Sequence, residues 1–440
     1  MQSQLAVVLH LSLLGSVLAG AVFAEGGMIP EAWLVCQLLI GLLAVTWAFS
    51  GRGSGFSPDW TQRFSVALIC LPLYAAFQAV PLPLTLVQAL SPVRAELQRS
   101  VSLLVDQAPS WTPLSVVPSA SISFALRLAA YAVVYWIVCG LARHLGRFRF
   151  AAIAPVVVVA AIESAVAVAQ QFSGEAARGS YFNRNHLAGL LEMSLPFAVV
   201  AAVTMGRDTA RRSGTFSIVC AAGGAAVLIL SGILATRSRA ALLAVSASLL
   251  VLGAGAVASL VRLRRKWLLA ALPPALLAAG LLYLTPESLV RRYGALAGRE
   301  NLLREGRVLL WSETLDLIAA YPLVGCGFGG YEAAFLRYKQ SEPMVTDTHA
   351  HNDYLELLAE AGVIGFALCV ALVVPVTVAA LRKSQQPGHA ETSLALACVG
   401  SLTAILVHSF VDFNLRIPAN GMVFCWVLGV CRAVSAREAA

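Results

Sequence analysis

Charged residues are scarce in this chain. Asp, Glu, Lys and Arg make up 12% of its 440 residues, whereas a soluble domain carries about 25%. Hydrophobic residues reach 59% and the mean hydropathy is +0.78. This deficit of charge excludes an ordinary soluble protein and predicts an integral membrane protein.

Paired cysteines are also lacking. The nine cysteines include no CxxC pair, and most fall in apolar runs, where Cys behaves as a small apolar residue. Only Cys326 is expected in a loop. The pattern excludes a disulfide framework and a zinc site of the paired-cysteine type.

No Lys or Arg precedes the first apolar run, although a secretory signal normally begins with basic residues. The run ends in Val22-Phe23-Ala24-Glu25, which resembles a signal-peptidase site. We interpret 5–24 as the first membrane span, with cleavage of this run as the alternative.

Long apolar runs are what the chain does contain. A run of about 20 apolar residues can cross the bilayer as a helix. The runs lie at 5–24, 32–49, 64–80, 121–141, 151–172, 187–205, 215–235, 240–260, 267–284, 354–380, 394–411 and 418–434. They predict an all-α polytopic membrane protein with about twelve transmembrane helices.

The runs divide the chain into three parts. Residues 1–284 are expected to hold helices 1–9 with an outer loop at 81–120. Residues 285–352 are expected to form an outer loop subdomain. Residues 353–440 are expected to hold helices 10–12 and a short cytoplasmic tail.

Basic residues are distributed unevenly between the two sides of the membrane. With the N-terminus inside, the inner loops and the C-terminal end carry Arg52, Arg63, Arg143, Arg147, Arg149, Arg207, Arg211, Arg212, Arg262, Arg264, Arg265, Lys266, Arg382, Lys383, Arg432 and Arg437. Because Lys and Arg in short loops set orientation, we expect both termini to be cytoplasmic. The net charge of +8 therefore needs no nucleic-acid partner.

A second basic group, nearly all arginine, is expected on the outer side or within a span. It consists of Arg94, Arg99, Arg127, Arg178, Arg184, Arg237, Arg239, Arg291, Arg292, Arg299, Arg304, Arg307, Arg337, Lys339 and Arg416. Arginine keeps its charge and binds phosphate through two parallel hydrogen bonds. The group indicates an anionic ligand in the outer leaflet. The alternative is that long loops escape the orientation rule and that these side chains reach lipid phosphates.

The two long outer loops carry local signals. Residues 93–105 are predicted to form an amphipathic helix at the membrane surface. Apolar residues at near-helical spacing predict a helix over 301–319, which ends before Pro322. The glycine run from Gly325 to Gly330 has no preceding strand, so it is interpreted as a tight turn for close packing rather than a dinucleotide site.

Histidine supplies the strongest chemical signal. His349 and His351 stand just before the tenth span, and imidazole is the side chain best suited to accept a proton near neutral pH. Asp347 and Asp353 are close enough in sequence to orient one of them. Together with His186, the pair could complete a metal site only if the loops converge, and we expect no metal and no cofactor.

Three further polar clusters are expected on the same side. They are 181–188, which contains Arg184, Asn185 and His186; 236–239, which contains Arg239; and 408–418, where Asp412 and Arg416 are expected to form a structural pair. Capping of the following helix is the alternative reading of the first cluster.

These residues resemble the O-antigen ligase and O-antigen polymerase superfamily of bacterial membrane glycosyltransferases. Ligases of that family carry His, then Asn, Ser or Gln, nine residues, and Gly-x-x-Gly; His351-Asn352 and Gly362-Val363-Ile364-Gly365 meet this pattern. The segments 306–311, 322–327, 183–188 and 238–239 are also similar. The resemblance is concentrated in 178–420.

The resemblance implies an enzyme of the bacterial inner membrane with a periplasmic active site. It would move a glycan from undecaprenyl diphosphate to a lipid A core sugar or another glycan acceptor, without a metal and with inversion. His351 would be the general base. Arg184, Arg239 and Arg307, with Arg304 in second rank, would bind the diphosphate. Asn352, Asn185, His186, His349 and Asp353 would support them.

Several functions remain open at this point. A polymerase would add the glycan to another lipid-linked repeat, and a protein O-oligosaccharyltransferase would move it to Ser or Thr. A transporter of an anionic solute belongs to a different class, and it predicts broken helices with charges near the midplane. Membrane lipids are expected as partners in every case.

Overall fold

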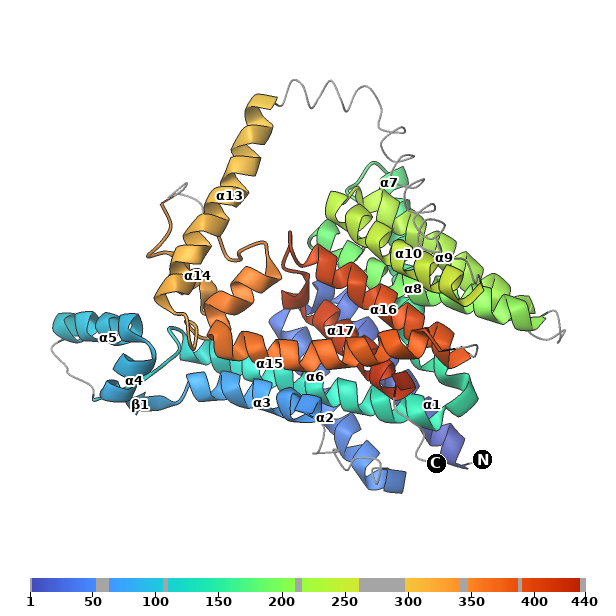
Figure 1. Cartoon of the computed structure of the whole chain (residues 1–440), viewed down its shortest axis with the longest axis horizontal. Helices are drawn as coiled ribbons and strands as arrows, with labels where there is room; N and C mark the ends of the chain where they lie inside the picture. Colours follow the sequence, from blue (N-terminus) through green and yellow to red (C-terminus); the bar gives the residue numbers. More distant parts are fainter. Residues whose placement is uncertain are drawn as a thin grey trace.

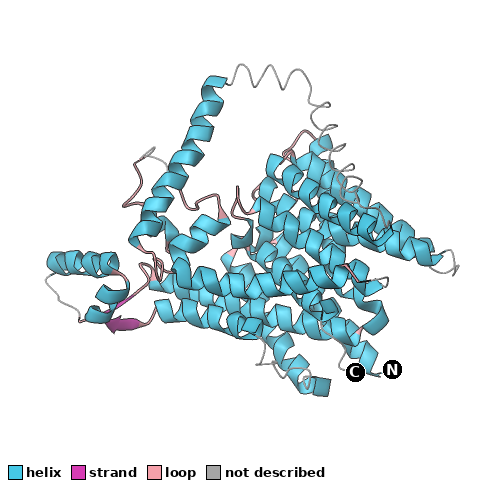
Figure 2. Cartoon of the chain, viewed as in Figure 1, coloured by secondary structure: helices cyan, strands magenta, loops and turns pink. Residues whose placement is uncertain are grey.

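The computed structural model describes residues 2–52, 63–105, 110–209, 216–260, 297–340, 347–386 and 390–435. Within these ranges the chain is almost entirely helical (Figures 1 and 2). Among the described residues, ten helices are long and apolar enough to cross a membrane. The expectation of an all-α polytopic membrane protein is therefore confirmed. The predicted span 267–284 lies outside the described residues.

The element bounds are as follows. The first half contains α1 (Gln2–Phe23), η1 (Glu25–Gly27), α2 (Pro30–Trp47), η2 (Ala48–Arg52), α3 (Arg63–Gln78), β1 (Pro81–Pro83), α4 (Leu84–Leu90), α5 (Pro92–Val105), β2 (Trp111–Pro113), α6 (Pro118–His144), η4 (Gly146–Ile153) and α7 (Ala154–Phe172). The second half contains α8 (Arg184–Thr209), α9 (Phe216–Thr236), α10 (Arg239–Leu260), α13 (Ala297–Ala320), α14 (Tyr331–Phe335), α15 (Asp353–Ser384), α16 (Ala390–His408), η6 (Asn414–Arg416) and α17 (Pro418–Ser435).

Helix α17 is the centre of the bundle. Almost every residue from Pro418 to Val434 is buried, because α17 is apolar or small on all sides and packs against α1, α6, α15 and α16. Glycine permits the closest approach: a Cβ added at Gly429 would lie 2.8 Å from the Tyr135 carbonyl oxygen of α6. By contrast, α2 and α9 expose most of their apolar side chains, as lipid-facing helices do.

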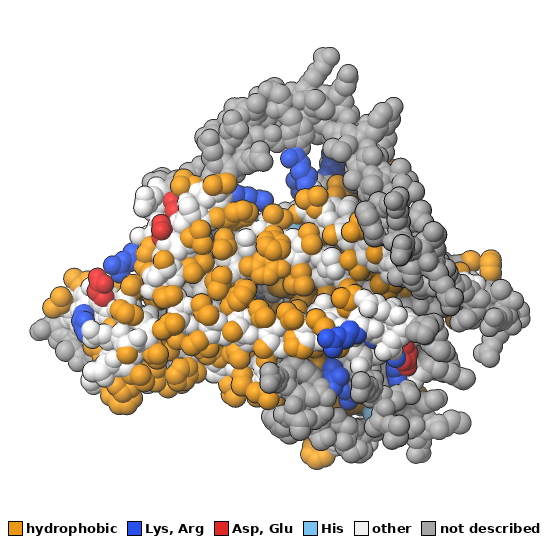
Figure 3. All heavy atoms as spheres, viewed as in Figure 1, with side chains coloured by type: hydrophobic (Ala, Val, Ile, Leu, Met, Phe, Trp, Pro, Cys, Tyr) orange, Lys and Arg blue, Asp and Glu red, His pale blue; other side chains and the backbone are white. Residues whose placement is uncertain are grey.

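Side chains are segregated along the bundle (Figure 3). Hydrophobic side chains cover the face made by α3, α15 and α16, whereas charged side chains gather near the helix ends. The first turns of α1 and the last turns of α17 lie at the same end of the bundle (Figure 1). A membrane-spanning bundle has this distribution, since charge in the hydrocarbon core is costly.

The described parts of the two long loops contain secondary structure. In the first, β1 pairs antiparallel with β2, and the predicted amphipathic helix is confirmed as α5. In the second, the predicted helix over 301–319 is confirmed as α13, which ends one residue before Tyr321-Pro322. Residues 285–296 and 341–346 of that loop lie outside the described residues.

Candidate functional site

The loop that carries His351 is fixed at both ends. On one side, the Trp311 indole N–H of α13 donates to the Ala350 carbonyl at 3.0 Å. On the other, the Asn352 side chain caps α15 by accepting from the backbone N–H groups of Tyr354 and Leu355 at 3.0 and 3.1 Å. His351 itself has a φ of +48°, a left-handed conformation that non-glycine residues seldom adopt. Such backbone strain is concentrated at functional sites.

Helix α15 is broken at Gly362, nine residues after Asp353. There φ is +61°, and an added Cβ would lie 2.4 Å from the Leu323 carbonyl. The glycine-rich turn fills the break: the N–H groups of Cys326 and Gly327 donate to the carbonyls of Ala359 and Glu360 at 2.9 and 3.0 Å. The prediction of a tight turn for close packing is confirmed. The spacing from His351 to Gly362 is thus the length of one short helix.

His351 faces the buried carboxylate of Asp412. Its Nδ1 lies 3.5 Å from Asp412 Oδ1, is buried and has no hydrogen-bond partner among the described residues, while the side chain as a whole remains 36% exposed. This distance is too long for a good hydrogen bond, and contacts of catalytic groups often shorten only when substrate binds. A carboxylate at Nδ1 favours the tautomer with the proton there, which leaves Nε2 with a free lone pair.

Asp412 is held by groups from α8 and by its own chain. Its Oδ2 accepts from the Asn185 side chain at 2.8 Å, and its Oδ1 accepts from the Phe413 N–H at 2.9 Å. His186 Nε2 lies 3.9 Å from Oδ1. Burial opposes the charge, but His351, His186 and the Phe413 N–H together hold the pKa of Asp412 well below its usual value. The carboxylate is therefore ionised at neutral pH.

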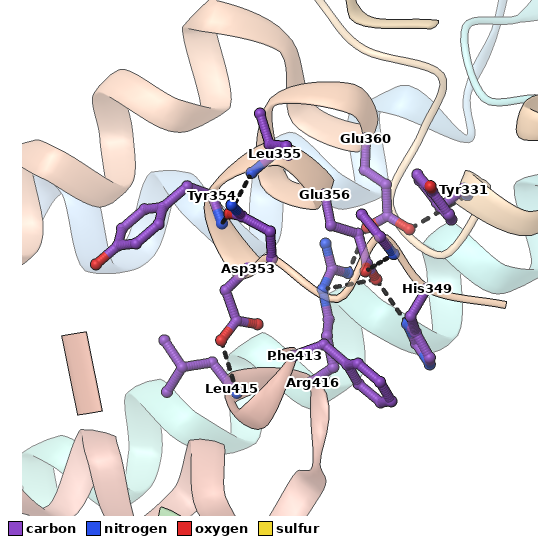
Figure 4. Close-up of polar contacts among 12 residues, drawn as sticks. Tyr331, His349, Asp353, Tyr354, Leu355, Glu356, Glu360, Phe413, Leu415 and Arg416 are labelled. Atoms are coloured by element: carbon purple, nitrogen blue, oxygen red, sulfur yellow. Dashed lines mark hydrogen bonds and ion pairs between the residues drawn. The ribbon is translucent and has the colours of Figure 1, made fainter. Parts of the chain in front are cut away.

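The predicted pairing of Asp412 with Arg416 is wrong. Arg416 instead binds Glu356, at 3.2 Å from Nε to Oε1, and Glu360 through Nη1 (Figure 4). The two glutamates are four residues apart, so they lie on one face of the first turns of α15, and that face meets η6. Asp412 precedes η6 and faces α8.

The aspartates expected to orient a histidine do not do so. Asp347 pairs with Lys339. Asp353 accepts from the Ser409 hydroxyl at 2.8 Å and from the Leu415 N–H at 3.2 Å, which ties the start of α15 to the loop before α17. Glu356 takes the expected place, since its Oε1 lies 2.8 Å from His349 Nδ1.

The predicted diphosphate-binding arginines lie on three helices. Arg184 begins α8 beside Asn185, Arg239 begins α10, and Arg307 lies one turn before Trp311 on α13. All three are exposed. Arg304 falls on α13, but its side chain lies outside the described residues.

Two of these helices begin at the same end of the bundle. Gly232, near the end of α9, packs against Ser164 of α7. The adjacent Glu163 accepts from the Ser180 N–H and hydroxyl at 2.9 and 2.7 Å, just before α8 begins. The short turn from α9 to α10 thus lies at the same end of the bundle as the start of α8 (Figure 1).

The sequence analysis did not predict that Asp412, Glu356 and Glu360 are part of the histidine site. A signal was present for the glutamates, since two acids four residues apart on an otherwise apolar helix need a cationic partner. No group of three or more His, Cys, Asp or Glu side chains within the described ranges is arranged to hold a metal ion.

Two comparisons with known proteins bear on this site. Residues 224–370 match the family model described as O-Antigen ligase. The chain is also 27% identical over 249 residues to the "Exopolysaccharide production protein ExoQ" of Rhizobium meliloti (strain 1021), and the aligned part covers 54% of each chain. The chain thus spans about half the length of this relative. The family match includes the α9–α10 turn, α13, the glycine-rich turn and His351.

Proposed function

We propose, from the place of this chain in the O-antigen ligase superfamily, that it is a ligase that transfers a glycan from undecaprenyl diphosphate to a hydroxyl of a lipid A core sugar. The similarity supports a membrane enzyme of the ligase or polymerase type. The donor, the acceptor, the periplasmic side and the bacterial inner membrane are our proposal.

The transfer is a single displacement at the anomeric carbon. His351 Nε2 accepts the proton of the acceptor hydroxyl as its oxygen bonds to the anomeric carbon, and the bond to the diphosphate oxygen breaks with its electron pair on the diphosphate. The anomeric centre is inverted. The observation that carries this assignment is an open imidazole whose Nδ1 faces a buried carboxylate 3.5 Å away. Asp412 acts as a positioning residue that stabilises the imidazolium.

The departing diphosphate needs fixed positive charge. Arg184 and Arg307 make no ion pair with any described residue, so their guanidinium groups are available to an anion. Together with Arg239, and with Arg304 in second rank, they would neutralise charge as the bond breaks. A diphosphate is a good leaving group, so this proposed step needs no metal.

His351→Ala tests the assignment. We expect a folded, membrane-inserted protein whose transfer rate falls by a factor on the order of 10²–10⁴, the usual contribution of a general base. His144→Ala is the matched control, because His144 is exposed at the opposite end of α6. Full activity of His351→Ala would remove the general-base assignment.

A polysaccharide polymerase is the second candidate, and the similarity to ExoQ, a protein named for exopolysaccharide production, favours it. The two functions can be distinguished by the products that purified protein forms from lipid-linked single repeats. A ligase transfers them only when lipid A core is added, whereas a polymerase builds a ladder without it. Transfer to Ser or Thr of a peptide would instead identify a protein O-oligosaccharyltransferase.

One feature would suit a transporter, namely the break in α15. The break lies at the His351 end of the helix rather than at its middle, and the glycine-rich turn fills it. Transport would require solute movement across vesicles that survives His351→Ala.

A further inference from the structure

Two histidines of the site have different surroundings although they are two residues apart. His351 Nδ1 faces Asp412 at 3.5 Å without a hydrogen bond, whereas His349 Nδ1 lies 2.8 Å from Glu356 Oε1. Both rings contact Phe413: His349 is stacked on it at 4.0 Å, and His351 meets its edge at 5.0 Å. Neighbouring titratable groups with different environments take different proton states, and hence different roles.

The charge of a buried network determines the state of His349. Glu356 and Glu360 are 1% and 2% exposed, and both contact Arg416 (Figure 4). One guanidinium cannot balance two carboxylates. In the described part of the chain, the other cationic partner of this pair is His349.

While both glutamates are ionised, a proton on His349 makes the network neutral. A neutral His349 would then leave one carboxylate uncompensated in a buried site, which is strongly unfavourable, and only a proton on one of the glutamates could replace it. Burial of the ring opposes its protonation, but the adjacent Glu356 carboxylate more than offsets this and raises the pKa of His349 above its ordinary value.

The groups that face His349 come from every side. Glu356 and Glu360 approach from α15 and Arg416 from η6, while His186 of α8 contacts the same phenyl ring of Phe413 at 4.7 Å. Among the described residues, only Glu356 hydrogen-bonds to His349. The two carboxylates outweigh the one guanidinium.

The far edge of the His349 ring is open. The side chain is 26% exposed, and Nε2 has no hydrogen-bond partner among the described residues. Stacking on Phe413 fixes the plane of the ring. An imidazolium held in this way presents one N–H donor beside His351.

We propose that His349 is a substrate-binding cation, whose Nε2–H donates to a phosphate oxygen of the lipid-linked diphosphate while His351 acts as the base. This inference rests on the proposed glycan transfer and adds a titratable cation to the arginines. A charge-assisted hydrogen bond suits phosphate better than a neutral sugar hydroxyl.

The test is the binding of a synthetic polyprenyl diphosphate that carries one sugar, measured as Kd against pH with the full chain in nanodiscs. Both phosphates of this probe are esterified, so the probe itself does not titrate near neutral pH. For the unaltered protein, we expect Kd to increase as the pH rises through the pKa of His349. Because arginine does not titrate in this range, the slope reports a histidine.

His349→Gln keeps an N–H donor but loses the charge. We expect binding of this variant to be roughly ten- to hundredfold weaker at low pH and independent of pH. His349→Arg should bind the diphosphate probe tightly, with a Kd that does not depend on pH. His351→Ala should keep both binding and slope but lose transfer, and His144→Gln should match the unaltered protein. A probe with the sugar on a polyprenol lacking phosphate should show no dependence on His349.

The outcomes separate the two proposals. If His349→Gln, shown to be folded by size-exclusion chromatography, keeps the affinity and the slope, His349 does not bind the diphosphate, and glycan transfer by His351 still stands. If the unaltered protein binds no diphosphate at any pH, both proposals fail.

Discussion

Asp412→Asn removes the negative charge behind His351 and one of two acceptor oxygens. The amide has nearly the shape of the carboxylate, and its single oxygen can accept from either the Phe413 N–H or the Asn185 side chain, but not from both. The loss that concerns His351 is the negative charge 3.5 Å from its Nδ1. That charge matters most in the transition state, when the imidazole carries the proton of the acceptor.

The size of the effect follows from this distance. Two unit charges 3.5 Å apart attract by about 5 kcal/mol at an effective dielectric constant of about 20. The imidazole side chain is 36% exposed, so solvent screens a substantial part of this energy. We therefore expect a loss of about 1.5–3 kcal/mol in the transition state, or a ten- to hundredfold lower kcat.

The assay is transfer from lipid-linked glycan by purified protein, with kcat and KM measured separately. KM should change little, because Asp412 does not contact the donor in our proposal. A fall in kcat at an unchanged KM indicates an interaction made only in the transition state.

Asp316→Asn is the matched control, since Asp316 is an exposed carboxylate on α13. It should leave kcat and KM unchanged. If Asp412→Asn keeps the kcat of the unaltered protein, the pairing of Asp412 with His351 is not part of catalysis.

Three further predictions concern the structure that supports the site. Arg416→Ala leaves two buried carboxylates without their guanidinium, so the free energy of unfolding, measured by denaturation, should fall by about 3–5 kcal/mol. Arg337→Ala is the control, because it breaks an exposed ion pair and should lower the free energy of unfolding by less than about 1 kcal/mol. Gly362→Ala places a Cβ 2.4 Å from backbone in a glycine-only conformation and should lower Tm and activity together, while Gly41→Ala in α2, where the added Cβ meets nothing within 4 Å, should lower neither. Folding raises the pKa of His349, so its contribution to stability is fully present below the pKa of the unfolded state and is lost as pH rises through the pKa of the folded state. The Tm of the unaltered protein should therefore fall over that pH range. An equally steep fall in His349→Gln would contradict the assignment of a protonated His349.

Hydropathy alone predicted the helical bundle because the bilayer imposes one requirement on each span. Every backbone polar group must be satisfied within the segment, so a long apolar run such as 121–141 leaves no alternative to a helix. The break at Gly362 could not be predicted in the same way. It depends on a turn about 35 residues earlier that supplies hydrogen bonds to the interrupted helix.

The sequence also indicated which residues lie at the His351 end, but not which of them meet. Placement at one end follows from the order of the spans. Pairing depends on the rotation of each helix about its own axis, and that rotation is set by packing. Asp412 and Arg416 are one helical turn apart in sequence, yet η6 turns the chain so that Asp412 faces α8 and Arg416 faces α15.

The site combines two kinds of charged residue. Arg184, at the start of α8, and Arg307, within α13, are exposed, so their guanidinium groups remain solvated. The charges next to the histidines are instead buried and compensated within the protein, with Asp412 beside His351 and Glu356 beside His349. A buried carboxylate raises the pKa of a neighbouring imidazole through charge at short range, and Glu356 has this effect on His349. In an exposed loop, solvent would screen the carboxylate and weaken the effect.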